Sequence, residues 1–286
     1  MTHRRPEASK LNLCKELGVS RSKFYRYLNK KSTTKDSGDF ELIRAIFVER
    51  KCRIGIRQIK MLLKRRFLIT MNLKKIARIK NKYGLETQIR RKTRYREFSR
   101  KYQEHKTCKN ILKRAFKVRV PDQIFSTDIT QLNYGLKSSK IYLSAFKDLC
   151  SKEIVAFNIS SAPNIQLTNE ALSRFLAKDF TSPRRIIHSD QGFHFTHFSF
   201  RRSLKENKIL QSMSRKGNCL DNAPIESFFG LLKDHLDLHE CKSFEEAREL
   251  VTNEIAYYNN QRPQAGLKEM PPTEYRRHLL DNPGFS

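Results

Sequence analysis

The chain has 286 residues and a formal net charge of +29, with 58 Lys and Arg against 29 Asp and Glu. This length allows one large domain with one or two small ones, and the absence of any long apolar run argues against a membrane span or a secretory signal. The six cysteines are scattered without a CxxC pair. This spacing argues against a zinc knuckle and a disulfide framework, and it indicates a cytoplasmic location.

The positive charge is concentrated in the first part of the chain. Residues 1–120 hold 37 Lys and Arg against 9 Asp and Glu, a net of +28, whereas residues 121–286 hold 21 against 20, a net of +1. A one-sided field of this size attracts a polyanion, whereas an ordinary solvated surface mixes both signs. Nucleic acid is the favoured partner. An anionic membrane is the weaker alternative, because no long basic amphipathic helix with an aromatic face is apparent.

Residues 1–34 are predicted to form a helix, a glycine turn and a second helix. Arg21, Lys23 and Arg26 lie on the second helix and are candidate DNA contacts, because a helix-turn-helix presents such side chains to a groove. An ordinary basic helical hairpin explains this stretch equally well.

A linker is predicted over residues 30–39, followed by a second basic helical domain over residues 40–86, formed by a pair of helices. Asn72 is placed to cap the later helix and Gly84 to end it. One face of that helix carries the next candidate DNA contacts, Lys74, Lys75 and Arg78. Residues 87–119 are too basic to pack densely, so we expect a linker or arm that binds phosphates and orders on DNA.

The composition changes at residue 120, where a domain over residues 120–286 is predicted to begin. Three runs rich in β-branched and aromatic residues predict an antiparallel meander: 123–132, 140–149 and 153–160. A helix beginning at Asn164 or Thr168, a short strand over 184–190 and further helices follow. Ser243 and Glu246 form a capping box that opens a helix to about Asn260. This order indicates a mixed α/β layer fold.

Three acids occupy positions where a carboxylate needs an explanation. Asp128 interrupts a half-buried strand, Asp190 ends a strand, and Glu226 lies in the first turns of a helix. Each has a simple structural explanation, respectively a bridge within the sheet, a turn and the helix dipole. Together they are less easily dismissed, because a carboxylate in the centre of a strand has few structural uses.

The helix after Pro224 supports a shared role for these acids. Its apolar positions form a buried stripe, and Glu226 and Lys233 fall within about 20° of each other on the border of that stripe. If the acids converge, two carboxylates about 4 Å apart repel by about 4 kcal/mol at an effective dielectric near 20, so a cation is needed. Oxygen ligands without clustered His or Cys select Mg²⁺ or Mn²⁺, and two such ions serve phosphodiester transfer.

Several blocks of the sequence resemble one known family, the second-reading-frame products of insertion-sequence-three transposases. The similar blocks are LCKELGVSRSKFY at the start, IGIRQI at 54–59, STDIT at 126–130, IHSDQG at 187–192, SMSRKGNCLDNAPIESFFGLLK at 212–233, and YNNQRP followed by PPTEY within 258–275. Asp190 and Glu226 are separated by 35 residues, as in the family's Asp-Asp-35-Glu signature, and Lys233 follows seven residues later.

The resemblance implies a ribonuclease-H-like integrase core, with a mixed five-stranded sheet and helices on both faces. It further implies that Asp128, Asp190 and Glu226 are the metal-binding catalytic acids and that Lys233 contacts transposon DNA. The expected reaction is metal-dependent cleavage at the terminal inverted repeats, followed by strand transfer into target DNA. A homo-oligomer on DNA, the product of an upstream reading frame as a partner, and a bacterial, nucleoid-associated location are also implied.

Two positions depart from the family pattern: Phe125 stands near where Trp is usual, and Gln264 stands where His is common. Phenylalanine fills the same kind of apolar site, and neither change affects the acids. Arg215 and Lys216 are candidate phosphate contacts, although a solvated loop explains them almost equally well.

Other polar residues near the acids have structural explanations. We expect His188, His194 and His197 to be packing or solvated residues, and Asp221 and Asn222 to cap the following helix. Two rival functions share parts of this reading: a nuclease that only hydrolyses, and a DNA-binding regulator without catalysis.

Overall fold

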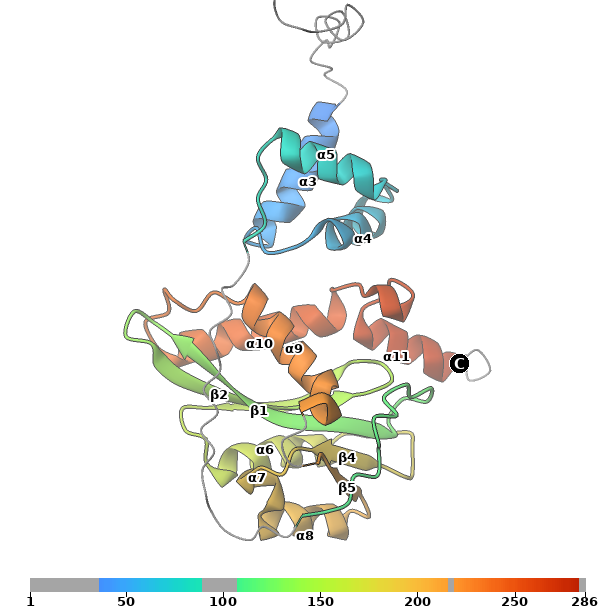
Figure 1. Cartoon of the computed structure of the whole chain (residues 1–286), viewed down its shortest axis with the longest axis vertical. Coiled ribbons are helices and arrows are strands. Elements are labelled where there is room, and N and C mark those ends of the chain that lie inside the picture. Colours follow the sequence, from blue (N-terminus) through green and yellow to red (C-terminus); the bar gives the residue numbers. More distant parts are fainter. Residues whose placement is uncertain (1–35, 89–106, 216–218, 283–286) are drawn as a thin grey trace, which may run out of the picture.

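The computed structural model describes residues 36–88, 107–215 and 219–282. A small helical domain lies on one side and a larger α/β domain on the other (Figure 1). The predicted helix-turn-helix, with Arg21, Lys23 and Arg26, lies outside the described residues, as does Lys216.

The helical domain consists of α3 (Ser37–Glu49), α4 (Ile56–Phe67) and α5 (Leu73–Lys82). The two predicted signals for α5 are confirmed. The Asn72 side chain accepts a hydrogen bond from the Lys74 backbone N–H at 2.8 Å, and Gly84 adopts a φ of +65° just after the helix end.

The prediction of a helical pair in this domain, and of a linker through residue 39, is wrong. Three helices pack around one apolar core, because each of them places isoleucine, leucine or phenylalanine side chains on its inner face. The helix α3 begins at Ser37, and Asp36 just before it is buried. The carboxylate of Asp36 accepts hydrogen bonds from both terminal nitrogens of Arg78, at 2.7 and 2.8 Å. Polar composition hid this helix start, since its serine, glycine and aspartates also suit a linker.

The α/β domain contains one sheet of five strands in the order β3-β2-β1-β4-β5. The strands are β1 (Ile124–Tyr134), β2 (Ser139–Asp148), β3 (Ile154–Ser160), β4 (Ile186–Ser189) and β5 (Leu210–Met213). The first three form the predicted antiparallel meander, whereas β4 pairs in parallel with β1 and β5 in parallel with β4. Sequence patterns located four strands, and the four-residue β5 is too short to show a periodicity.

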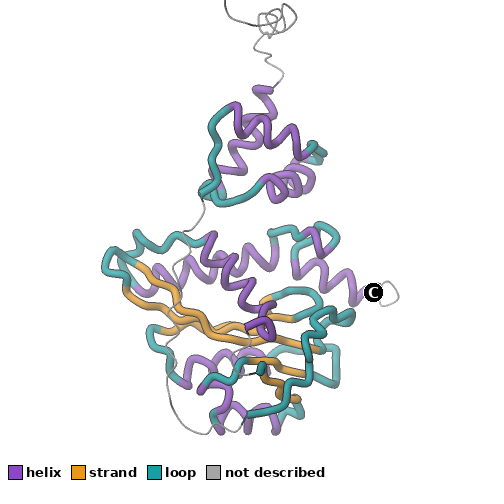
Figure 2. Tube along the Cα trace, in the orientation of Figure 1, coloured by secondary structure: helices purple, strands orange, loops and turns teal. Residues whose placement is uncertain are grey.

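Helices cover both faces of this sheet, and Figure 2 shows them as two layers. One layer contains α6 (Ile165–Leu176), α7 (Phe193–Thr196) and α8 (Phe198–Glu206). The other contains α9 (Ala223–His235), α10 (Phe244–Asn260) and α11 (Pro272–Asp281). Two predicted N-caps are confirmed: Asn164 accepts from Leu167 N–H at 3.0 Å, and Ser243 accepts from Glu246 N–H at 3.1 Å.

Each face of the sheet has its own apolar core. Leu132 and Ile141 pack with Ile225, Phe228 and Leu232 of α9, which confirms the predicted buried stripe. On the opposite face Phe125 is fully buried and meets Phe175 edge-on, with the ring centroids 4.8 Å apart. Phenylalanine therefore fills the apolar site where tryptophan was expected.

The segment before the sheet was predicted to be part of a basic arm, but its described part lies on the core. Leu112 is buried, and the Ile111 backbone N–H donates to Ser212 Oγ at 2.9 Å. Asn110 and Arg114 bond to the buried carboxylate of Asp221 at 3.0 and 2.8 Å. Residues 107–114 are thus fixed beside the start of α9, and the prediction of a free arm is wrong for them.

The helical domain also contacts the α/β domain through arginines. Arg50 binds both oxygens of Glu254 at 2.8 and 2.9 Å and lies 3.5 Å from the ring centroid of Tyr257. Arg53 donates to the Leu236 carbonyl at 2.6 Å and to Asp237 at 2.9 Å. These contacts join the helical domain to the end of α9 and to α10. Within the described ranges, no helix combines the length and apolar composition that crossing a bilayer requires.

Candidate active site

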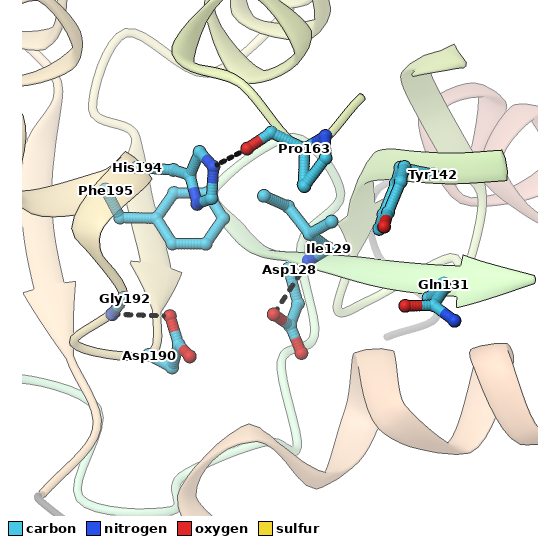
Figure 3. A pocket seen from close by; sticks show the side chains of 9 residues that line it. All are labelled: Asp128, Ile129, Gln131, Tyr142, Pro163, Asp190, Gly192, His194 and Phe195. Carbon is cyan, nitrogen blue, oxygen red and sulfur yellow. Dashed lines mark hydrogen bonds between the residues drawn. The ribbon is translucent and has the colours of Figure 1, made fainter. Parts of the chain in front are cut away.

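The fold brings the first two predicted acids together. Asp128 lies within β1 and Asp190 directly follows β4, and these neighbouring strands run parallel. Both residues line one pocket, shown in Figure 3, whose walls are Asp128, Ile129, Gln131, Tyr142, Pro163, Asp190, Gly192, His194 and Phe195. Residues far apart in the sequence therefore meet at the sheet, as predicted for these two acids.

The carboxylate of Asp128 is held by two neutral donors. Its Oδ1 accepts from the Ile129 backbone N–H at 2.7 Å, and its Oδ2 accepts from Asn222 Nδ2 at 3.1 Å. Burial, followed by the charge of Asp190 and then that of Glu226, raises its pKa well above the ordinary value, while the nearby Lys233 ammonium acts in the opposite direction.

Asp190 is fixed by a tight loop. Its Oδ1 accepts from the Gly192 backbone N–H at 2.9 Å, and burial raises its pKa, with this hydrogen bond and the His194 charge opposing the rise. A Cβ at residue 192 would lie only 2.8 Å from Asp190 Oδ1. Glycine is needed there because any side chain would push the carboxylate out of place.

Helix α9 carries the third acid and the lysine. Glu226 lies in its first turn, and burial together with the charge of Asp190 raises the pKa of Glu226. The charge of Glu226 adds to the raised pKa of Asp128, and the charge of Lys233, two turns further along α9, opposes it. Over the described ranges, His, Cys, Asp and Glu side chains form no group of three or more that could hold a metal ion.

Three histidines lie at or near the pocket, and each has a hydrogen-bond partner within the protein. His188 lies between Ser212 Oγ at 2.9 Å and Ser214 Oγ at 3.2 Å, with its ring buried. His194 Nε2 bonds to the Pro163 carbonyl at 2.8 Å, and His197 caps α8 through the Ser199 N–H. These contacts leave the aspartates as the acidic groups of the pocket.

The prediction that Asp221 and Asn222 cap α9 is wrong. The side chain of Asn222 makes no cap bond and reaches Asp128 instead. Asp221 accepts from Arg114 and from the backbone and guanidinium of Arg215, and these hydrogen bonds hold its pKa far below the ordinary value. The sequence did not predict the contact of Asn222 with Asp128 or that of Asp221 with the two arginines. Its only local signal at these positions was a polar pair before a helix that begins with Pro224 in its first turn, which is the pattern of a cap.

Several predicted DNA contacts already have acidic partners. Arg215 pairs with Asp221 at 2.9 Å, Lys75 pairs with Asp39 at 2.5 Å, and Arg78 pairs with Asp36. The side chain of Arg215 is nevertheless 61% exposed and that of Arg78 56% exposed. Their contact with DNA, like that of Lys74, stays a prediction.

Comparison with known proteins agrees with this architecture. The family models described as integrase core domain match residues 118–219 and 207–272, and an HTH-like domain matches residues 35–93. The transposase InsK for insertion sequence element IS150 of Escherichia coli is 34% identical over 260 residues, covering 90% of each chain. The transposase InsF for insertion sequence IS3A of the same species is 27% identical over 226 residues, covering 77% of each chain.

A solved structure gives a more distant likeness. The HTLV-2 integrase catalytic core domain in complex with magnesium is 16% identical, with a TM-score of 0.41, over 55% of this chain and 97% of that one. The helical HTH-like domain, the five-stranded sheet and the integrase-core matches define the architecture of this chain. The chain belongs to the insertion-sequence-three family of transposases, polynucleotidyl transferases that act on DNA in transposition and integration.

Proposed function

We propose that Asp128, Asp190 and Glu226 are the catalytic acids of transposition and that they hold two divalent ions, Mg²⁺ or Mn²⁺. The observation that carries this proposal is geometric: Asp128 and Asp190, from neighbouring parallel strands, line one pocket. Burial raises the pKa of both carboxyls and of Glu226, and the charge of Asp190 adds to the rise at the other two acids. Carboxylates gathered in this way repel one another at neutral pH unless a cation joins them.

The residues at this site fit such ions. The donors are carboxylate oxygens, and both aspartates face the same pocket (Figure 3). Hard oxygen donors are the ligands that Mg²⁺ and Mn²⁺ prefer. When bound, these ions would make water a stronger nucleophile and would stabilise the leaving oxygen.

The two chemical steps follow from this arrangement. In the first, the oxygen of water attacks the phosphorus at a transposon end, and the P–O3′ bond breaks to free a 3′-hydroxyl. In the second, this 3′-hydroxyl attacks a phosphodiester of target DNA, and the 3′ oxygen of the target strand leaves. Lys233 follows Glu226 two turns along α9, and its ammonium would contact the DNA backbone beside the reacting phosphate.

A strand-transfer assay with labelled end oligonucleotides tests the acids. Asp128→Asn, Asp190→Asn and Glu226→Gln are each expected to lower cleavage and joining by about a thousandfold or more, because each removes an anionic ligand. The exposed Asp179 offers a matched control, and Asp179→Asn is expected to retain full activity. Full activity in Asp190→Asn would refute the assignment.

The same assay separates the rival functions. A nuclease that only hydrolyses would free the 3′-hydroxyl without joining it to target DNA, and a DNA-binding regulator would show no metal-dependent cleavage. Homo-oligomerisation on DNA and a partnership with the product of an upstream reading frame belong to the same proposal. Light scattering of the chain with end DNA, alone and with that product, would detect either assembly.

A further inference from the structure

Asn222 occupies the N-cap position of α9 without acting as a cap. Its side chain bonds to no backbone N–H of the helix, although asparagine is among the best capping residues. The residue is only 2% exposed, and its Nδ2 reaches Asp128 Oδ2 at 3.1 Å across 94 residues of sequence. The side chain therefore serves the acid on β1 rather than its own helix.

A neutral amide is the suitable donor for this contact. An aspartate at residue 222 would repel Asp128, and a lysine or arginine would neutralise it and compete with a cation. The amide orients the carboxylate and leaves its negative charge in place. Exchanging the amide oxygen and nitrogen by a 180° flip would bring two acceptors, Asn222 Oδ1 and Asp128 Oδ2, into contact. The observed orientation, with Nδ2 as the donor, is therefore the favourable one.

The turn that carries Asn222 is itself fixed. The neighbouring Asp221 has no exposed side-chain surface and binds Arg114, Arg215 and Asn110, with distances between 2.8 and 3.1 Å. On the other side of Asn222, the Lys147 ammonium donates to the Pro224 carbonyl at 2.8 Å. These contacts hold the peptide on both sides of Asn222, so its amide is presented to Asp128 in one position.

The oxygen of the same amide is the second polar atom of this side chain. Asn222 Oδ1 is buried and has no hydrogen-bond partner within the part of the chain that the structure describes. Buried polar atoms in folded proteins are rarely left unpaired, so this acceptor requires an explanation. The position suits a donor that arrives with the cation or the substrate.

We propose that Asn222 is a positioning residue that holds Asp128 in the orientation required to bind the divalent cation. This inference rests on the proposed role of Asp128 as a metal-binding acid. Groups that orient metal-binding side chains typically change metal affinity by 10- to 100-fold when they are removed.

Titration of the full-length, DNA-free chain with Mn²⁺, following free Mn²⁺ by electron paramagnetic resonance, tests the proposal. Asn222→Ser is the informative variant, because serine is equally good at an N-cap but is too short to reach Asp128. We expect Mn²⁺ affinity to fall at least tenfold, with the thermal midpoint close to that of the unaltered chain. Strand transfer should then require a higher Mn²⁺ concentration for half-maximal rate.

Two further variants separate the outcomes. Asn207→Ala removes an exposed amide that donates to the Ser203 carbonyl at the end of α8, and Mn²⁺ affinity should stay within about threefold. Asp128→Asn should abolish tight binding. If Asp128→Asn binds Mn²⁺ like the unaltered chain, the proposed metal-binding role of Asp128 is wrong. If Asp128→Asn loses Mn²⁺ binding while Asn222→Ser binds like the unaltered chain, only the proposed role of Asn222 is wrong. Should Asn222→Ser fold poorly, Asn222→Ala measured by the same titration decides between these results.

Discussion

The two ends of α9 are held in different ways. At the N-terminal end, buried contacts from the α/β domain itself fix the first turn: Asn222 with Asp128, Lys147 with the Pro224 carbonyl, and the bonds of Asp221. At the C-terminal end, Arg53 of the helical domain bonds to the Leu236 carbonyl. Glu226, a proposed catalytic acid, lies near the first end, so contacts within the integrase core fix the turn beside it, and the helical domain contacts the opposite end of the helix.

The burial of the acidic partners sharpens this difference. The Asp221 side chain is fully buried, whereas that of Asp237, which pairs with Arg53, is 43% exposed. Exposed ion pairs contribute about 0–1 kcal/mol, while buried hydrogen bonds to charged groups contribute about 1.5–3 kcal/mol. Substitutions at the N-terminal end should therefore have the larger effects on stability and on catalysis.

Among substitutions that loosen either end of α9, Asp221→Ala is expected to have the largest effect. It removes the acceptor that holds Arg114, Arg215 and the turn before α9, so the unfolding free energy should fall by about 2 kcal/mol and strand transfer by about a hundredfold. Denaturant unfolding and the joining assay measure these changes. Asp237→Ala, at the C-terminal end of α9, is the control. An equal loss of stability and of strand transfer in the two variants would contradict the proposed difference between the two ends of α9.

Asp221 also predicts a pH dependence. Its pKa is depressed in the folded chain, so its contribution to stability is present above the ordinary value near 4 and is lost as the pH falls below that. The difference in unfolding free energy between the unaltered chain and Asp221→Ala should therefore shrink at pH 3 relative to pH 7. A difference that is constant over this range would contradict the ionised state of Asp221.

A smaller, pH-dependent effect is expected for Lys147→Met. Burial lowers the pKa of Lys147 to about 7 from an ordinary value of 10.5, so the folded chain binds fewer protons than the unfolded chain between these limits. The contribution of Lys147 to stability should rise with pH from about 7 to 10, by an amount on the order of 1 kcal/mol or more. Unfolding measured at pH 6 and pH 9 should show this rise in the unaltered chain but not in Lys147→Met.

Lys140, exposed on the same strand, offers the control for Lys147. Lys140→Met should follow the unaltered chain at both pH values, because this side chain is exposed. A pH dependence that survives in Lys147→Met would assign it to another group.

The smallest effect on catalysis is expected for Arg53→Ala. It removes the contact with the C-terminal end of α9, so stability should fall by about 1 kcal/mol, while Mn²⁺ binding stays within about threefold. Arg57→Ala, at an exposed position of the neighbouring helix, serves as the control. Loss of Mn²⁺ binding in Arg53→Ala would mean that the helical domain, and not the core, sets the geometry of the acids.

Local sequence signals predicted much of this molecule. Asn72, Asn164 and Ser243 cap the helices expected of them, and enrichment in β-branched and aromatic residues located the meander. Asp128 and Asp190 were identified as unusual because a carboxylate rarely belongs within or at the end of a buried strand. These features depend on residues that are close together in the sequence.

The contacts that tertiary structure creates could not be read in the same way. Asn222 and Asp221 look like capping residues from their position before Pro224, and only the folded chain brings them to Asp128 and Arg114. The helix start at Ser37 was missed because Asp36 finds its partner, Arg78, 42 residues away. In each case a distant partner, rather than local propensity, decides what the polar residue does.

Anomalous diffraction from crystals of the full chain soaked in MnCl₂ tests the assignment of the acids most directly. We expect Mn²⁺ to be coordinated by the carboxylate oxygens of Asp128 and Asp190, which line one pocket, and by Glu226 of α9 as the third acid of the proposal. Bound Mn²⁺ located elsewhere on the chain, with these carboxylates unligated, would contradict the proposed catalytic centre.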